Sequence, residues 1–441
     1  MKKVDLTKGN VFKVIVTLAI PIMGSSFLQF AYNLIDMLWV GGLGSDAVAA
    51  IGTSSFFISL GYSISSMVVI GVGIKIAHAI GKNDSHEIKE YINIGIFSMA
   101  IVAIIYAIFL IVFRKYLIGF FDLHNSYVSV EATKYLAVSA IVLIFSCFNM
   151  MYSRVLNSFG NNKLALKIST TGIVLNIILD PIFIYVFKIG VTGAAIATLI
   201  AQIIMFLLFT FVKSSPFKYD FNTKISGGKL KLVFKLGVPM AMQRSLFTLV
   251  NIVLARVVSS FGTDAIAAQK IGLQVESITY MVIGGLNGAV GAYIGQNFGA
   301  KKYDRVDKGY DKALIVGMIY AIITTIIFLA IPKQIVCLFV RQKETIEIAA
   351  DYLRIVGLAQ IFSAVEVISN GLYTGLGKPK IPSIVSMVFT ALRIPMALVF
   401  IKIWGVNGIW ISIAVSSMFK GVISFLIYKL KVKKDLFAMK I

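Results

Sequence analysis

The sequence is poor in the residues that reactive and metal-binding sites use. Its 441 residues include two cysteines, three histidines and 20 aspartates and glutamates. Cys147 and Cys337 lie in apolar runs without a CxxC pair or other metal-ligand spacing, so we expect free structural thiols. The chain has no P-loop, so ATP does not drive its activity directly. Its polar connections are short and lack acid, histidine or cysteine clusters, which argues against an enzyme.

Charge is also scarce, because 14% of the residues are charged and 58% are hydrophobic. A soluble chain of this length would need far more charge to cover its surface. Long apolar runs follow one another instead, for example at 101–113 and 313–331. A helix of about 20 apolar residues spans the ~30 Å hydrocarbon core of a bilayer. The sequence therefore predicts an all-α polytopic membrane protein.

The apolar runs predict twelve transmembrane helices. The first run, after four lysines, is longer than the roughly 7–15 residues of a cleaved signal, so we expect it to be retained. The most polar long connection, 213–235, is predicted to be a cytoplasmic linker between 1–212 and 236–441. The predicted spans are 12–40, 48–79, 91–113, 128–158, 164–187, 192–212, 233–260, 265–297, 311–332, 346–375, 381–402 and 407–429.

The formal net charge of +22 reflects membrane topology rather than nucleic-acid binding. Basic residues lie at helix ends and in connections, with no basic and aromatic stripe. They concentrate at both termini and in the even-numbered connections, which places both termini in the cytoplasm by the positive-inside rule. We expect a monomer in the plasma membrane, with membrane lipid and small molecules as partners and no nucleic acid.

The two halves of the chain are repeats. The segment 44–50 (GSDAVAA) recurs at 262–268 (GTDAIAA), and Pro21 matches Pro239 at the same offset of 218 residues. Six helices per half, an even number, predict parallel repeats related by an axis along the membrane normal. We therefore expect two pseudo-symmetric six-helix lobes around a central cavity. Further matches at offsets of 215 to 218 are Gly81 with Gly299, Tyr135 with Tyr352, Gly160 with Gly377 and Gly190 with Gly405.

Four acidic residues lie within the predicted spans: Asp36, Asp180, Glu276 and Glu366. A charge at the bilayer centre costs about 2.5–3.5 kcal/mol on insertion scales, so each carboxylate should face the interior of a helix bundle. Intramembrane acids of this kind mark ion or substrate paths. They are the principal candidates for function.

Asp36 and Asp180 are predicted to lie at similar depths in the outer part of the first half. Asn176 is one helical turn before Asp180, and Thr198 falls at a similar depth on the next helix. Two carboxylates, an amide and a hydroxyl are hard oxygen ligands that suit a small cation such as Na⁺. The same carboxylates could bind protons instead, or only hydrogen-bond a neighbouring helix. Pro181 removes a backbone donor beside them and can kink its helix.

The second half differs in its charges. It has Leu254 at the position that matches Asp36, and three arginines accompany its two carboxylates within the spans. Internal pairing would satisfy these buried charges without any transport role, and a role in transport is the alternative. The charged residues concerned are Arg244, Arg256, Arg393, Glu276 and Glu366.

The segments YNLIDMLWVGGLG (32–44) and LNIILDPIFIYVF (175–187), with Gln29, resemble the multidrug and toxic compound extrusion (MATE) family. They are similar to its prokaryotic branch with a cation site in the first lobe. The resemblance implies a cavity that opens alternately to each side, and antiport of an organic compound against Na⁺ or H⁺. It implies the same cation ligands: Asp36, Asn176, Asp180 and Thr198. We expect the cavity to be lined by Gln29, Tyr135, Asn149, Gln243, Arg244, Glu276 and Glu366.

The leading hypothesis is a secondary active exporter of amphiphilic, cationic compounds that needs no cofactor beyond a coupling ion, which would be Na⁺ or H⁺. The alternative is a flippase for a lipid-linked saccharide or another anionic lipid, because intramembrane arginines suit a diphosphate. A passive channel would move solute only down its gradient.

Overall fold

A computed structural model of the chain describes residues 5–121, 125–212, 216–217, 219–221 and 223–439. Within these ranges the chain is helical and contains no β-strand. Twelve segments of the described chain are long and apolar enough to cross a membrane, which confirms the predicted number. The protein is therefore a multi-pass membrane protein.

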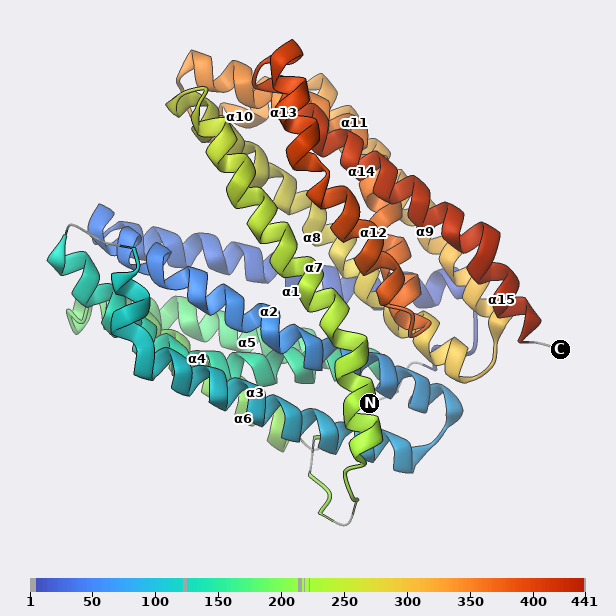
Figure 1. The fold of residues 1–441 in the computed structure, drawn as a ribbon. Coiled ribbons are helices and arrows are strands. Elements are labelled where there is room, and N and C mark those ends of the chain that lie inside the picture. The colour runs from blue at the N-terminus through green and yellow to red at the C-terminus, as the bar shows by residue number, and fades with distance from the viewer. Residues whose placement is uncertain (1–4, 122–124, 213–215, 218, 222, 440–441) are drawn as a thin grey trace. The chain divides into compact units, whose positions relative to one another are not determined.

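Six of these segments belong to the first half of the chain. Their ends extend beyond several predicted spans, because charged and polar residues continue the helices past the apolar runs. They are α1 (Val11–Gly41), α2 (Ser45–Lys82), α3 (Ser85–Gly119), α4 (Ser126–Ser158), α5 (Asn162–Pro181) with the π-helical turn η1 (Ile182–Val186), and α6 (Val191–Phe211), labelled in Figure 1.

The second half repeats this order. The predicted span 381–402 is one crossing segment made of two helices, because Pro395 lacks the N–H that would bond to Ala391 and the helix breaks at Leu392. The elements are α7 (Gly227–Ser259), α8 (Thr263–Gly299), α9 (Tyr303–Ala330), the short α10 (Pro332–Val336), α11 (Lys343–Gly375), α12 (Lys380–Ala391), α13 (Arg393–Trp404), α14 (Asn407–Ile427), the π-helical turn η2 (Tyr428–Val432) and α15 (Lys433–Ala438).

The chain forms two compact units. Unit 1 contains Gly24–Val238, and unit 2 contains Leu6–Met23 and Pro239–Ile441. Helices α1 and α7 therefore each contribute to both units. The predicted linker 213–235 leads into α7, which begins at Gly227; its positions 213–215, 218 and 222 lie outside the described residues.

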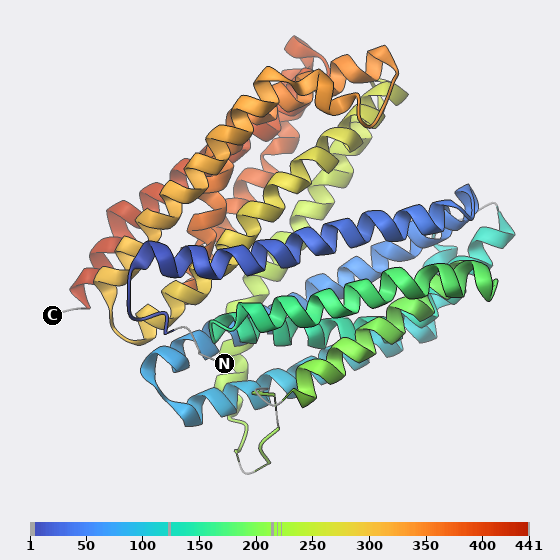
Figure 2. The same cartoon turned by 180° about the vertical axis from the view of Figure 1, so that it is seen from behind.

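Helices at equivalent positions of the repeat pack against equivalent neighbours in the two units. In unit 1, α4 packs against α2, α3 and α6, and in unit 2, α11 packs against α8, α9 and α14. Both views show these helices running beside their partners within each unit (Figures 1 and 2). The backbone repeats as well, since Gly44 and Gly262 have φ angles of 100° and 101°, and Gly160 and Gly377 both have 73°. The predicted pseudo-symmetric repeat is confirmed.

The segment that precedes α1 is held by unit 2. Arg305 donates hydrogen bonds to the carbonyl oxygens of Leu6, Lys8 and Gly9 at 3.3, 3.1 and 2.8 Å. Asn297 also donates to the carbonyl of Leu6, at 3.0 Å. These bonds satisfy backbone carbonyls that have no helical partner, and they assign the start of α1 to unit 2.

The segment that precedes α7 is held by unit 1 in a comparable way. Asn93 donates to the carbonyl oxygens of Asp220 and Thr223 at 2.7 and 3.2 Å. Lys229 forms an ion pair with Glu90 at 2.5 Å. Helix α1 thus begins in unit 2 and ends in unit 1, whereas α7 begins in unit 1 and ends in unit 2.

Candidate cation site in unit 1

Helices α5 and α6 bring three of the predicted ligands together. Asn176 donates from Nδ2 to Asp180 Oδ1 at 3.1 Å and to Thr198 Oγ1 at 3.4 Å. Asp180 and Asn176 share one face of α5 because they are four residues apart, and their exposed fractions are 0% and 2%. Thr198 also donates to the carbonyl of Ala194 at 2.9 Å, one turn earlier on α6.

Helix α1 supplies the fourth predicted ligand. The carboxyl groups of Asp36 and Asp180 lie close enough to interact directly. Two ionised carboxylates repel each other, and a proton or a cation held between them would relieve that repulsion. Tyr32, one turn before Asp36, lies close to Thr198, and Tyr135 of α4 lies close to both acids. The structure therefore brings the four predicted residues into one cluster.

Three oxygens of this cluster lack a partner. Asp36 Oδ1, Asp180 Oδ2 and Asn176 Oδ1 are each shielded from solvent and accept no hydrogen bond from the described residues. None of the ion pairs in the described part of the chain involves either aspartate. Buried oxygens are normally satisfied, so the cluster fits a small oxygen-coordinated cation or protons.

The chain directly after Asp180 opens into a wider turn. Pro181 has no N–H to donate, so α5 ends there and Ile182–Val186 form a π-helical turn. Gly193 of α6 lies against this turn, since a Cβ atom at 193 would lie 2.7 Å from the carbonyl oxygen of Phe183. The predicted disturbance at Pro181 is present, and it adjoins the acids.

We expect Gly193→Ala to lower the melting temperature of the purified protein and its transport rate. The added methyl group meets backbone rather than a movable side chain, and such overpacking costs about 1–3 kcal/mol. Gly284→Ala is the matched control, because nothing lies within 4 Å of a Cβ at that helical glycine. Thermal unfolding in detergent compares the two variants. Equal melting temperatures would show that the contact with the π-helical turn is unimportant.

Sequence reasoning missed the aromatic residues that support the cluster. Tyr32 shares a helix face with Asp36 at a spacing of four residues, and that spacing could have identified it. Tyr185 in η1 donates to the carbonyl of Trp39 in α1 at 2.5 Å, and their rings meet edge to face at 6.2 Å. No local sequence signal pairs these two residues, which are 146 positions apart.

The two carboxylates predicted in the second half lie inside unit 2. Glu366 of α11 forms an ion pair with Lys420 of α14 at 3.0 Å, and the two side chains are 8% and 5% exposed. Glu276 of α8 accepts a hydrogen bond from Tyr352 at 2.7 Å. Sequence analysis considered arginine partners and overlooked Lys420.

The three intramembrane arginines have different surroundings. Arg393 is buried, donates to Ser416 and Ser417 at 3.0 and 3.3 Å, and lies near Glu276. Arg244 and Arg256 are exposed on α7 and take part in none of the ion pairs found among the described residues. Only one of the three arginines therefore joins the buried carboxylates.

The other residues predicted to line a cavity are distributed over both units. In unit 1, Gln29 is exposed and donates to Asn33 at 3.3 Å, whereas Asn149 is buried and donates to the Gln202 side chain at 2.8 Å. In unit 2, Gln243 is partly buried, and its Oε1 has no partner among the described residues. Within the described residues, none of these three side chains hydrogen-bonds Asp36 or Asp180.

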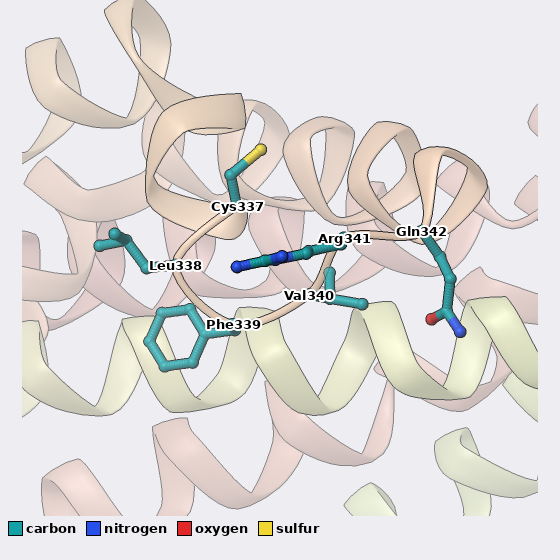
Figure 3. Close-up of a pocket in the computed structure, with 6 residues that line it drawn as sticks. All are labelled: Cys337, Leu338, Phe339, Val340, Arg341 and Gln342. Atoms are coloured by element: carbon teal, nitrogen blue, oxygen red, sulfur yellow. The ribbon is translucent and has the colours of Figure 1, made fainter.

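A hollow of about 520 Å³ lies in the connection between α10 and α11 (Figure 3). Its lining consists of the six consecutive residues Cys337–Gln342, which include Arg341 and no acid. This basic and apolar lining does not suit a cation, and the hollow belongs to unit 2, whereas the acid cluster belongs to unit 1.

Comparisons with known proteins agree with this fold. Among curated proteins, the chain is similar to "Probable multidrug resistance protein YpnP" of Bacillus subtilis (strain 168), at 26% identity over 97% of both chains. It is also similar to "Probable multidrug resistance protein NorM" of Thermotoga maritima, at 24% identity over 94% of this chain and 92% of the relative. A crystal structure of MATE in the bent conformation matches with a TM-score of 0.92, at 23% identity over 100% of this chain and 99% of the other.

The fold and the repeated units define a multi-pass membrane protein of two related six-helix halves. The MatE family model matches the chain twice, over residues 21–182 and 239–399, so each half carries one copy of the family pattern. The chain belongs to the MatE family. The resemblance seen in the sequence is thereby confirmed.

Proposed function

We propose that this chain is a secondary active multidrug exporter, which moves amphiphilic organic cations out of the cytoplasm in exchange for Na⁺ or H⁺. The coupling cation binds between Asp36 and Asp180, with Asn176 and Thr198 completing its oxygen ligands. The observation that carries this proposal is the set of three buried, unpartnered oxygens on Asp36, Asn176 and Asp180. Cation binding there would tip a balance between two arrangements of the chain, as alternating access requires.

The distribution of charge supports unit 1 as the coupled unit. Its two membrane acids have no basic partner among the described residues, whereas Glu366 in unit 2 is paired with Lys420. An uncompensated carboxylate in the membrane gains most from a bound cation. The relatives named as multidrug resistance proteins support export of drug-like compounds over an enzymatic role.

The same proposal includes the setting of the protein. The chain would act as a monomer in the plasma membrane, with both termini in the cytoplasm and with lipid and small molecules as its partners. The concentration of lysine and arginine in the even-numbered connections supports this orientation. No cofactor other than the coupling ion is required.

The flippase alternative is not favoured. It would use intramembrane arginines to bind a diphosphate. Buried Arg393 is engaged by two serine hydroxyls beside Glu276, which leaves only Arg244 and Arg256 of the three for that role. The relatives compared above are named for multidrug resistance. We therefore retain export of organic compounds as the proposed activity.

We expect the reconstituted protein to move a fluorescent cationic dye uphill when one of two gradients is imposed alone, either Na⁺ or pH. An antiporter derives work from its coupling ion, so the gradient that drives the dye identifies that ion. Dye fluorescence in proteoliposomes measures the movement, and protein-free liposomes are the control. Downhill movement alone under both gradients would indicate a passive channel.

A further inference from the structure

Unit 2 contains a buried group of acidic and basic side chains in equal number. Glu366 and Lys420 approach to 3.0 Å within helices α11 and α14, and both are less than a tenth exposed. Glu276 lies close enough to Arg393 and Lys420 for direct electrostatic interaction. Two acids are thus balanced by two bases within the membrane-spanning part of this unit.

The repeat shows what replaces these charges in unit 1. Glu366 lies 217 residues after Asn149, at the offset that relates Tyr352 to Tyr135. Asn149 of α4 contacts Gln202 of α6 through neutral amides at 2.8 Å. The matching helix pair in unit 2, α11 and α14, makes its polar contact through a carboxylate and an ammonium group instead.

The matched tyrosines also face acids in both units. Tyr135 lies close to the two aspartates of unit 1, and Tyr352 donates to Glu276 at 2.7 Å in unit 2. Neither Asp36 nor Asp180 takes part in an ion pair among the described residues, whereas Glu276 and Glu366 of unit 2 are accompanied by Arg393 and Lys420. Basic side chains therefore accompany the acids at the matched position in unit 2 but not Asp36 and Asp180 in unit 1.

We propose that Lys420 is a tethered cation that takes the place of a bound coupling ion in unit 2. Its ammonium group supplies one positive charge to the Glu366 carboxylate, as Na⁺ would, but it is always present because it is part of the chain. Cation exchange is consequently limited to unit 1. This inference deepens the proposed function by assigning the stoichiometry of one coupling site, and its test does not depend on transport.

The test first disables the cation site of unit 1 by replacing Asp36, and then removes the ammonium group of Lys420 from unit 2. In an Asp36→Asn background, we expect the melting temperature of the purified full-length protein to be the same in NaCl and choline chloride. Adding Lys420→Ala leaves Glu366 unbalanced beside a space the size of a lysine side chain. We then expect a saturable rise in melting temperature with Na⁺ or ethylammonium at pH 8, and no rise with the larger choline. Adding Glu366→Gln should abolish this rise.

Two results would overturn the inference. One is a D36N/K420A protein that responds to cations no more than D36N/E366Q/K420A does. The other is a D36N protein that keeps a Na⁺ response which the charge-balanced D36N/E366Q/K420A protein lacks, because unit 2 would then bind a cation despite Lys420. The comparison of D36N with D36N/E366Q/K420A still tests the inference if the D36N/K420A protein does not fold. Failure of the proposed function has a different signature, namely normal dye export by D36N alone.

Discussion

Asp36→Asn is expected to abolish export of a cationic dye driven by the coupling gradient. The substitution keeps the shape of the side chain and removes one of the two negative charges. At 4 Å and an effective dielectric constant near 20, that charge attracts a cation by about 4 kcal/mol before desolvation is counted. A net loss of even about 1.4 kcal/mol lowers the cation affinity tenfold, so we expect at least about a tenfold fall in driven export.

Protein stability separates this loss from misfolding. Because Asp36 lies close to a second carboxyl group, its neutralisation relieves repulsion, and D36N should melt no lower than the wild type in the absence of Na⁺. Asp46→Asn is the control, since Asp46 is exposed at the start of α2 and bonds Asn125 at 3.2 Å. Dye export by both variants is measured in the same proteoliposomes. A D36N protein that pumps at the wild-type rate would refute the assignment of the coupling site.

Lys420→Met is expected to cost about 3–5 kcal/mol of stability, the usual penalty for leaving one partner of a buried ion pair uncompensated. Glu366 would lose its ion-pair partner in a site where it is 8% exposed. Removing both charges in E366Q/K420M should restore most of the loss, because neutral replacements of buried pairs are often harmless or stabilising. Thermal unfolding of the two single variants and the double variant, arranged as a double-mutant cycle, measures the coupling.

Lys429→Met provides the comparison for a lysine near the surface. Lys429 pairs with Asp311 at 3.3 Å, but these side chains are 34% and 45% exposed, so the expected cost is only about 0–1 kcal/mol. Similar losses for K420M and K429M would mean that the buried pair contributes no more than a surface pair. An additive cycle would lead to the same conclusion.

Much of the fold could be predicted because membrane insertion depends on local hydropathy. The twelve apolar segments and the repeat were visible in the sequence, and the family resemblance followed from two short segments of the first half. The cluster of Asp36, Asn176, Asp180 and Thr198 was also predictable. Asp180 and Asn176 share a face by helical spacing, and a membrane carboxylate must turn toward the bundle interior.

Other features depend on how helices are rotated and which of them are neighbours. Lys420 lies 54 residues from Glu366, and nothing in its local sequence distinguishes it from three arginines as the partner. The bond from Tyr185 to Trp39 likewise joins residues that are distant in the chain. The division of α1 and α7 between the two units has no signal in hydropathy, because each division falls inside a single predicted span, 12–40 or 233–260.

The amino-acid sequence by itself determined that this protein spans the membrane twelve times, that its halves repeat, and that two aspartates lie inside the first half. These properties follow from side-chain transfer free energies and from the 3.6-residue period of the helix, which act over short stretches of chain. Only the tertiary structure decided that Asp36 and Asp180 meet without a basic partner, while Glu276 and Glu366 of unit 2 lie beside Arg393 and Lys420. Charge pairing inside a bundle is set by contacts between helices far apart in the chain, where packing selects the face that each helix presents.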